Sequence, residues 1–318
     1  MRVFDPEVLL HITNKCVQDR YFLLPTQETN ELIRGWLARS LAEYPGVEVY
    51  AFIFLSNHFH LLLRDNTGDL PGFMGYFKGN LAKAVNRMLG RKRVSVFERS
   101  YESRVVLTDG DAESVCGYVL TNAVKEDLVA RATEGPFFSS LEMALEGRPR
   151  SVSFLNRTRR HDKSRGGREV SKEEVTDVFA LSLAPLPGHR GLSLEERRRR
   201  IEGLVGERER LHARRRRAEG KEVLGARRLL RYKPWMRPRN PSVRGPRDPV
   251  YSRDRERAAE YERGLRELAS AYREAFARYR RAATRGRRTA VGWPAWTYPP
   301  SSIRPVVPAG WEPRVEVS

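Results

Sequence analysis

The amino-acid sequence predicts an α+β fold followed by a basic, mainly helical extension. Strand-like and helix-like patterns alternate over residues 1–135 in the order β-α-β-β-α-β, which closes as a four-stranded antiparallel sheet with two helices on one face. The 318-residue chain is 40% hydrophobic, enough for a packed core. Its net charge of +19 resides entirely after residue 130, because residues 1–130 hold 15 basic and 16 acidic side chains, a net of −1.

Each early element has its own local signal. Residues 8–14 are typical of a strand, and residues 27–44 of an amphipathic helix, because their apolar residues recur every three or four positions. Residues 47–55 are β-branched and aromatic, as in a buried strand. A short turn at residues 56–57 leads into a second strand over residues 58–63, so the two strands form a hairpin.

The remaining elements complete the first domain. Residues 70–90 carry an apolar stripe that predicts a long helix, and residues 101–108 predict the fourth strand. Asp109 and Asp111 are expected to cap a further helix that runs to about Val124. This order is the ferredoxin-like or RRM-like arrangement, and we place the end of the domain at residue 135.

The second half has a different composition. Residues 136–190 are expected to be a linker or a mobile segment, because much of this stretch is rich in Gly, Arg and Ser. Residues 191–318 form an Arg-rich extension with helices expected over 192–219 and 253–282. The apolar stripe of the last helix predicts packing against the first domain or, in the less common case, against a second chain.

Several classes of protein are excluded by composition. Two cysteines, Cys16 and Cys116, are too few for a disulfide framework or for a cysteine-only zinc site. The sequence has no apolar run long enough to cross a membrane and no signal segment at its start, so we expect a cytoplasmic protein without a membrane partner.

Two histidines on one strand are the sharpest chemical signal. Side chains alternate along a strand, so His58 and His60 emerge on one face while Phe59 points to the other. Two adjacent imidazoles can supply two ligands to a divalent cation. Taken alone, such a pair is more often structural.

Tyr118 and Asn122 are spaced to share one face of the predicted helix. A tyrosine hydroxyl can act as a nucleophile and form a covalent intermediate. An asparagine carbonyl oxygen can bind Mg²⁺ or Mn²⁺. The alternative is structural: Tyr118 is an ordinary half-buried aromatic residue, and Asn122 ends the helix.

The stretch Ser-Asn-His-Phe-His-Leu-Leu-Leu at 56–63 resembles the PNHxHLL signature of the HUH single-strand transposases, and in particular of the REP-associated tyrosine transposases. Four further landmarks agree with this family in order and spacing, so the resemblance covers residues 8–130. They are His-Ile-Thr-Asn-Lys at 11–15, Phe-Glu-Arg-Ser-Tyr at 97–101, Tyr118 with Asn122, and Val-Lys-Glu-Asp-Leu-Val at 124–129.

The resemblance implies an HUH domain and a role for each matching residue. His58 and His60 match the metal-binding pair, Asn122 the third ligand and Tyr118 the nucleophile. The implied cofactor is Mg²⁺ or Mn²⁺, without a nucleotide cofactor. The implied activity is a single-strand DNA endonuclease and strand transferase that forms a 5′-phosphotyrosyl intermediate.

The family also implies a partner and an assembly. The expected substrate is single-stranded or hairpin DNA from imperfect palindromic repeats, in the nucleoid of a bacterium. We expect a monomer, and a homodimer stays open. The sequence departs from the family pattern at Ser56 and Ala123, where proline is usual, and at Ser103, where a carboxylate is common.

The basic extension indicates nucleic-acid binding on its own account. Cations that neutralise phosphates, interleaved with aromatic residues that stack on unpaired bases, are typical of single-strand binding. The alternative is a solvated helix surface with internal ion pairs. The residues that we expect to contact DNA are Arg214, Arg215, Arg216, Arg217, Arg227, Arg228, Arg231, Lys233, Trp235, Arg237 and Arg239.

Two other functions remain open at this point. One is an RRM-like protein that binds nucleic acid without cutting it. The other is an HUH replication initiator or relaxase, although the spacing around the histidines fits transposases better.

Overall fold

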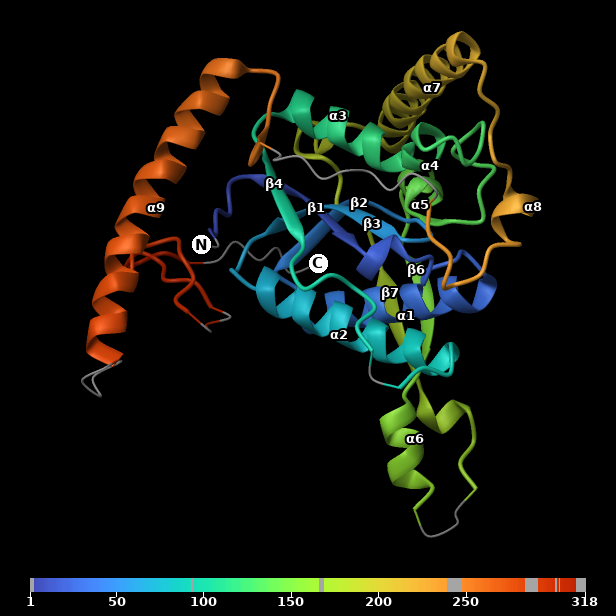
Figure 1. Ribbon diagram of the computed structural model, residues 1–318, viewed down its shortest axis with the longest axis horizontal. Helices are drawn as coiled ribbons and strands as arrows, with labels where there is room; N and C mark the ends of the chain where they lie inside the picture. Colours follow the sequence, from blue (N-terminus) through green and yellow to red (C-terminus); the bar gives the residue numbers. More distant parts are fainter. Residues whose placement is uncertain are drawn as a thin grey trace.

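The computed structural model describes residues 3–92, 94–165, 169–238, 248–283, 291–300, 302 and 304–312. Its centre is a six-stranded sheet in the order β5-β2-β3-β1-β4-β8 (Figure 1). Only the β4–β8 pair is parallel, so the α+β class with a mostly antiparallel sheet is confirmed. The strands are β1 (Leu9–Lys15), β2 (Val47–Phe54), β3 (His58–Asp65), β4 (Glu102–Val106), β5 (Phe138–Ser139) and β8 (Val250–Tyr251).

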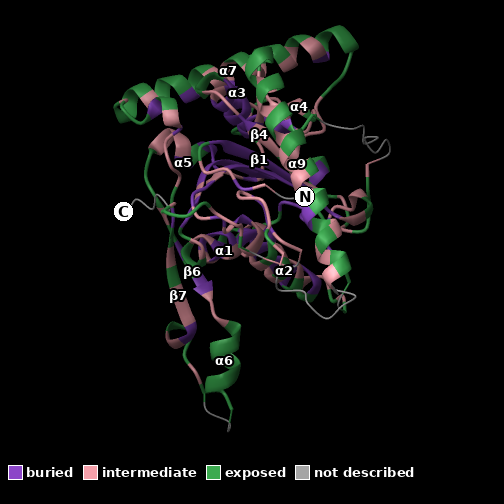
Figure 2. Ribbon diagram, turned by 90° about the vertical axis from the view of Figure 1, so that its left-hand side faces the viewer, coloured by how far each residue is buried: buried purple, intermediate pink, exposed green. Residues whose placement is uncertain are grey.

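The sheet is covered on both faces, so the molecule has two hydrophobic cores. Helices α1 (Gln27–Glu43) and α2 (Leu70–Met88) pack on one face, against the side that carries Phe59, Leu61 and Leu63. Helix α3 (Asp109–Leu120) packs on the other face, which carries Leu62, and α7 (Leu194–Glu219) packs against α3. Figure 2 shows the buried strands between these layers. Because side chains alternate along β3, this strand contributes residues to both cores.

The helix that carries the candidate tyrosine differs in detail from the expectation. Its N-cap is Thr108, whose hydroxyl accepts a hydrogen bond from the Asp111 N–H at 3.1 Å, and not Asp109 or Asp111. The helix stops at Leu120, and α4 (Asn122–Lys125) follows as a separate turn. The break lies at Thr121, whose hydroxyl donates to the Gly117 carbonyl at 2.6 Å and so satisfies that carbonyl locally.

Residues 136–190 are structured over most of their length instead of forming a linker. The strands β6 (Arg150–Leu155) and β7 (Thr176–Leu181) make a hairpin whose Phe154 packs edge-on against Trp36 of α1 at 4.8 Å. A few apolar residues at alternating strand positions suffice for this docking, because each is buried against α1. The other elements are β5, α5 (Leu141–Glu146), α6 (Arg157–Lys163), and the 3₁₀ turns Glu173–Val175 and Pro187–His189.

The extension contains the two expected long helices, α7 and α9 (Arg255–Ala283), together with the short α8 (Ala226–Leu229). In Figure 1, α7 lies beside α3 while α9 borders the opposite edge of the sheet, next to β8. The stripe of α9 packs within the chain, because Tyr261 donates to Asp5 at 2.9 Å and Tyr272 contacts Trp293. None of the described helices has the length and apolarity needed to cross a membrane.

Candidate active site on the sheet face beneath α3

The two central strands bring the histidines together. β1 and β3 pair with Thr13 opposite His60 and Lys15 opposite His58, so these side chains lie on the face covered by α3. The rings of His58 and His60 are 5.0 Å apart, centre to centre, and perpendicular. The shared face predicted from strand alternation is therefore present, with Phe59 in the opposite core.

Tyr118 lies over the same histidines. Its ring meets His60 edge-on at 5.4 Å, and it is half-buried. The position follows from α3, since Val115 and Val119 are buried against the sheet and direct the neighbouring turn of the helix toward the histidines. Tyrosine and imidazole thus converge although they are far apart in the sequence.

Asn122 completes the cluster. Its side chain is fully buried, and its contact with His58 is too poorly aligned to satisfy either amide atom. It lies beside His58, whose pKa it raises through a side-chain hydrogen bond, while the Glu126 carboxylate raises that pKa through its charge. A buried amide that is poorly satisfied is costly, so the Asn122 side chain has the capacity to bind a further group.

The protonation states suit metal binding. Desolvation lowers the pKa of His58 to about 4, which keeps its ring neutral at pH 7, the form that ligates metals. Its Nδ1 donates to Oδ1 of the Asn57 side chain at 2.8 Å, so the lone pair is on Nε2. Two imidazoles and one amide oxygen are a workable but sparse ligand set for a divalent cation. The described residues contain no group of three or more His, Cys, Asp or Glu side chains able to hold a metal.

Several residues of the cluster carry no assignment in the sequence analysis. His11 Nε2 and Thr13 Oγ1 approach Nδ1 of His60 at 3.0 and 2.9 Å, and they orient that ring. Lys125 lies 5.4 Å from the centre of the Tyr118 ring and pairs with Glu126 at 2.7 Å. Strand alternation would have identified His11 and Thr13, since both share the face of His60 across the ladder.

The residues expected to contact DNA divide into two groups. Arg215 and Arg216 are engaged inside the protein, with the carbonyl groups and the carboxylate that end α4. Arg239 lies outside the described residues. All the other members are exposed, namely Arg214, Arg217, Arg227, Arg228, Arg231, Lys233, Trp235 and Arg237.

Part of the exposed group, around Trp235, is joined through residues 19–21 to the turn that precedes His58. Tyr232 stacks on Tyr21 at 5.3 Å, and the Trp235 carbonyl accepts a hydrogen bond from Arg20. The segment that carries Arg20 and Tyr21 is joined in turn to the β2–β3 turn, because Asn57 donates to the Asp19 carbonyl at 3.4 Å. Trp235 is 63% exposed, so a large aromatic face is presented to solvent beside several cations.

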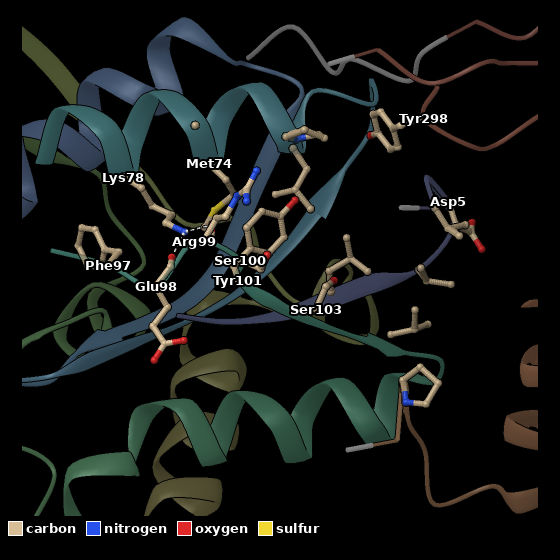
Figure 3. Close-up of a pocket in the computed structure, with 18 of the residues that line it drawn as sticks. Asp5, Met74, Lys78, Phe97, Glu98, Arg99, Ser100, Tyr101, Ser103 and Tyr298 are labelled. Atoms are coloured by element: carbon tan, nitrogen blue, oxygen red, sulfur yellow. Dashed lines mark hydrogen bonds between the residues drawn. The ribbon is translucent and has the colours of Figure 1, made fainter. Parts of the chain in front are cut away.

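A cavity of about 1160 Å³ lies on the other side of the sheet. Figure 3 shows its lining, with Met74 and Lys78 of α2 above the strand that carries Ser103. The Lys78 ammonium donates to the Glu98 carbonyl at 3.0 Å, and desolvation lowers its pKa to about 8. The cavity is separated from the histidine cluster by the sheet and is not part of that site.

Comparison with known proteins gives likenesses of fold. No protein-family model matches the chain, and no curated protein matches it. A solved REP-associated tyrosine transposase bound to a REP hairpin is 18% identical, with a TM-score of 0.39, over 46% of this chain and 84% of that one. The tRNA(His) guanylyltransferase of Saccharomyces cerevisiae is 11% identical, with a TM-score of 0.32, over 55% and 78%. A bacterial guanylyltransferase-like protein in complex with ATP is 10% identical, with a TM-score of 0.32, over 64% and 93%. At these identities the likeness is one of fold alone, and the chemistry has to be argued from the site.

Proposed function

We propose that this protein is a metal-dependent endonuclease and strand transferase for single-stranded, hairpin-forming DNA, with Tyr118 as its nucleophile. The observation that carries the proposal is the convergence of four groups from three elements. Strand β3 supplies His58 and His60, α3 supplies Tyr118, and α4 supplies the fully buried Asn122, whose side chain approaches His58. A tyrosine beside a buried cluster of polar side chains is suited to nucleophilic catalysis.

In the proposed reaction, the phenol oxygen of Tyr118 attacks the scissile phosphorus. A bond forms between that oxygen and phosphorus, the bond from phosphorus to the 3′ oxygen breaks, and the phenol proton is transferred in net to the 3′ oxygen. The products are a 5′-phosphotyrosyl enzyme and a free 3′-OH. Attack by another 3′-OH reverses the chemistry and joins two strands, so no nucleotide cofactor is required.

His58, His60 and Asn122 would hold Mg²⁺ or Mn²⁺, which supplies Lewis-acid polarisation of the phosphate when it is bound. The chain supports this arrangement with its own contacts. Thr13 and His11 orient the His60 ring, and Asn57 selects the tautomer of His58. The ammonium of Lys125, close to the Tyr118 ring, adds a positive charge where the phosphate would lie.

The exposed basic segment would hold the substrate. Its cations suit the phosphate backbone, and Trp235 suits stacking on an unpaired base. This grip is needed because residues 1–130 are almost neutral overall and offer little long-range attraction for DNA.

The test is incubation with hairpin oligonucleotides and Mn²⁺, followed by a denaturing gel and mass spectrometry. We expect a covalent protein–DNA adduct on Tyr118, loss of cleavage in Tyr118→Phe, and retained DNA affinity in that variant. Tyr76→Phe, on a helix at the other face of the sheet, is the matched control. Cleavage by Tyr118→Phe at the wild-type rate would refute the assignment, and tight binding without any cleavage would favour the RRM-like binder.

A further inference from the structure

The turn α4, which follows the nucleophile helix α3, is held by arginines of α7. Arg216 donates to the Val124 carbonyl at 3.2 Å, and Arg215 donates to the Lys125 carbonyl at 3.0 Å. Both guanidinium groups also pair with the Asp127 carboxylate. These are two of the four consecutive arginines in the block 214–217, whose outer members, Arg214 and Arg217, are exposed.

The segment that receives these contacts needs external support. α4 is a single turn of four residues, and an isolated turn of this length is unstable by itself. Thr121 separates it from α3, so α3 does not fix its position through a continuous helix. After α4 the chain enters the left-handed region at Asp127, with φ of 55°, a conformation that is unfavourable for a residue other than glycine. Cations at the final carbonyl groups of a helix are favourable.

The burial of Arg216 indicates a fixed role. Arg216 is only 7% exposed, and its guanidinium group contacts Val124 and Asp127, which follow Asn122. A second contact lies further up the helix, where Arg208 donates to the Ser114 carbonyl at 2.6 Å and lies against Gly117. α7 thus holds the nucleophile helix on either side of Tyr118.

We infer that Arg215 and Arg216 are positioning residues, which hold α4 so that Asn122 faces His58 beneath Tyr118. The inference rests on the proposed function, since it concerns the geometry of the same site. It assigns to the inner arginines of the block a role distinct from the DNA contact proposed for the outer pair. One side of α7 would then bind the substrate, and its other side would support the active site.

The test compares full-length Arg215→Ala, Arg216→Ala and Arg216→Lys with Arg217→Ala as the exposed control. Three quantities are measured: DNA affinity by fluorescence anisotropy, the single-turnover cleavage rate at saturating DNA, and Mn²⁺ affinity by electron paramagnetic resonance without DNA. For the inner alanine variants we expect DNA affinity within about twofold of wild type, and losses of about 10-fold or more in cleavage rate and Mn²⁺ affinity, as is usual when residues that orient metal ligands are removed. Arg216→Lys should recover part of the cleavage rate and part of the Mn²⁺ affinity.

Arg217→Ala should show the opposite pattern, with weaker DNA binding and wild-type Mn²⁺ affinity. The inference is overturned if the inner variants keep the wild-type saturating rate and Mn²⁺ affinity, or if they lose DNA affinity as Arg217→Ala does. Arg215, which is one-third exposed, provides a variant less prone to unfolding if Arg216→Ala does not fold. A wild-type protein that never cleaves would instead refute the proposed function, and Mn²⁺ binding by the variants would still test the positioning role.

Discussion

Removal of the exposed cations beside the histidine site should reduce the salt dependence of DNA binding by a calculable amount. The perturbation is the quadruple change of Arg227, Arg228, Arg231 and Lys233 to Gln. Seven of the basic residues predicted to contact DNA are described and exposed, namely Arg214, Arg217, Arg227, Arg228, Arg231, Lys233 and Arg237. If each neutralises one phosphate, log K falls with log salt with a slope of about −5 for single strands and about −6 for duplex DNA.

The quadruple variant keeps three of these cations, so its slope should be about −2 to −3. Between 50 and 200 mM salt, the wild-type affinity should therefore fall by about 3 to 4 powers of ten, against about 1.5 for the variant. The difference is large enough for fluorescence anisotropy with a labelled hairpin. No catalysis is required, so the measurement is independent of the assignment of Tyr118.

The control removes the same charge from another surface. Arg257, Arg263, Arg273 and Arg278 are exposed on α9, which lies at the opposite edge of the sheet. Their change to Gln should leave the slope nearly unaltered, because DNA held between α7 and the histidine site would not reach α9. Equal slopes in the wild type and the variant at 227–233, or equal effects of both quadruple changes, would refute the proposed DNA surface.

Three further predictions concern stability, each measured by urea unfolding. Thr108→Ala should destabilise the protein by about 1 kcal/mol, because the N-cap of α3 is lost, and no change would show that the cap is not needed. Leu37→Ala should cost about 2–5 kcal/mol, because Leu37 is fully buried beneath the sheet, and a cost below 1 kcal/mol would contradict this packing. Lys78→Met tests how the free energy of unfolding depends on pH. The pKa of Lys78 is lowered from 10.5 to about 8 in the folded protein, so between these pH values the unfolded chain binds more protons than the folded one. Wild-type stability relative to the variant should rise across that window by about 1–2 kcal/mol, after allowance for partial exposure, and a constant difference would contradict the desolvation.

The fold of the first domain could be predicted because its signals are local. The apolar runs of β2 and β3, the turn between them and the stripe of α2 each specify an element without reference to the rest of the chain. The same holds for His58 and His60, whose common face follows from strand alternation alone. The position of Tyr118 above them depended on a family resemblance, because sequence spacing does not show where a helix docks on a sheet.

Other features depend on contacts that no local pattern reveals. The β6–β7 hairpin has few apolar residues, and its stability comes from docking on α1, so its composition resembles that of a linker. The capping of α3 by Thr108 depends on one hydrogen bond, and the neighbouring Asp109 and Asp111 are equally good capping residues in the sequence. The sequence likewise does not show which of the four arginines at 214–217 are buried, because this depends on the elements that pack against α7.

This last point bears on how the basic charge of the chain is used. A run of four residues spans about one helical turn, so its members face all sides of α7 whatever their type. Two of the arginines consequently meet α4, where carbonyl groups and Asp127 compensate their charge, and two meet solvent. The charge available to DNA is therefore smaller than the composition implies, and the remainder stabilises the turn that carries Asn122. Substitutions on the outer side should alter affinity alone, whereas substitutions on the inner side should alter chemistry while affinity is retained, and this separation distinguishes a supporting helix from a simple DNA-binding one.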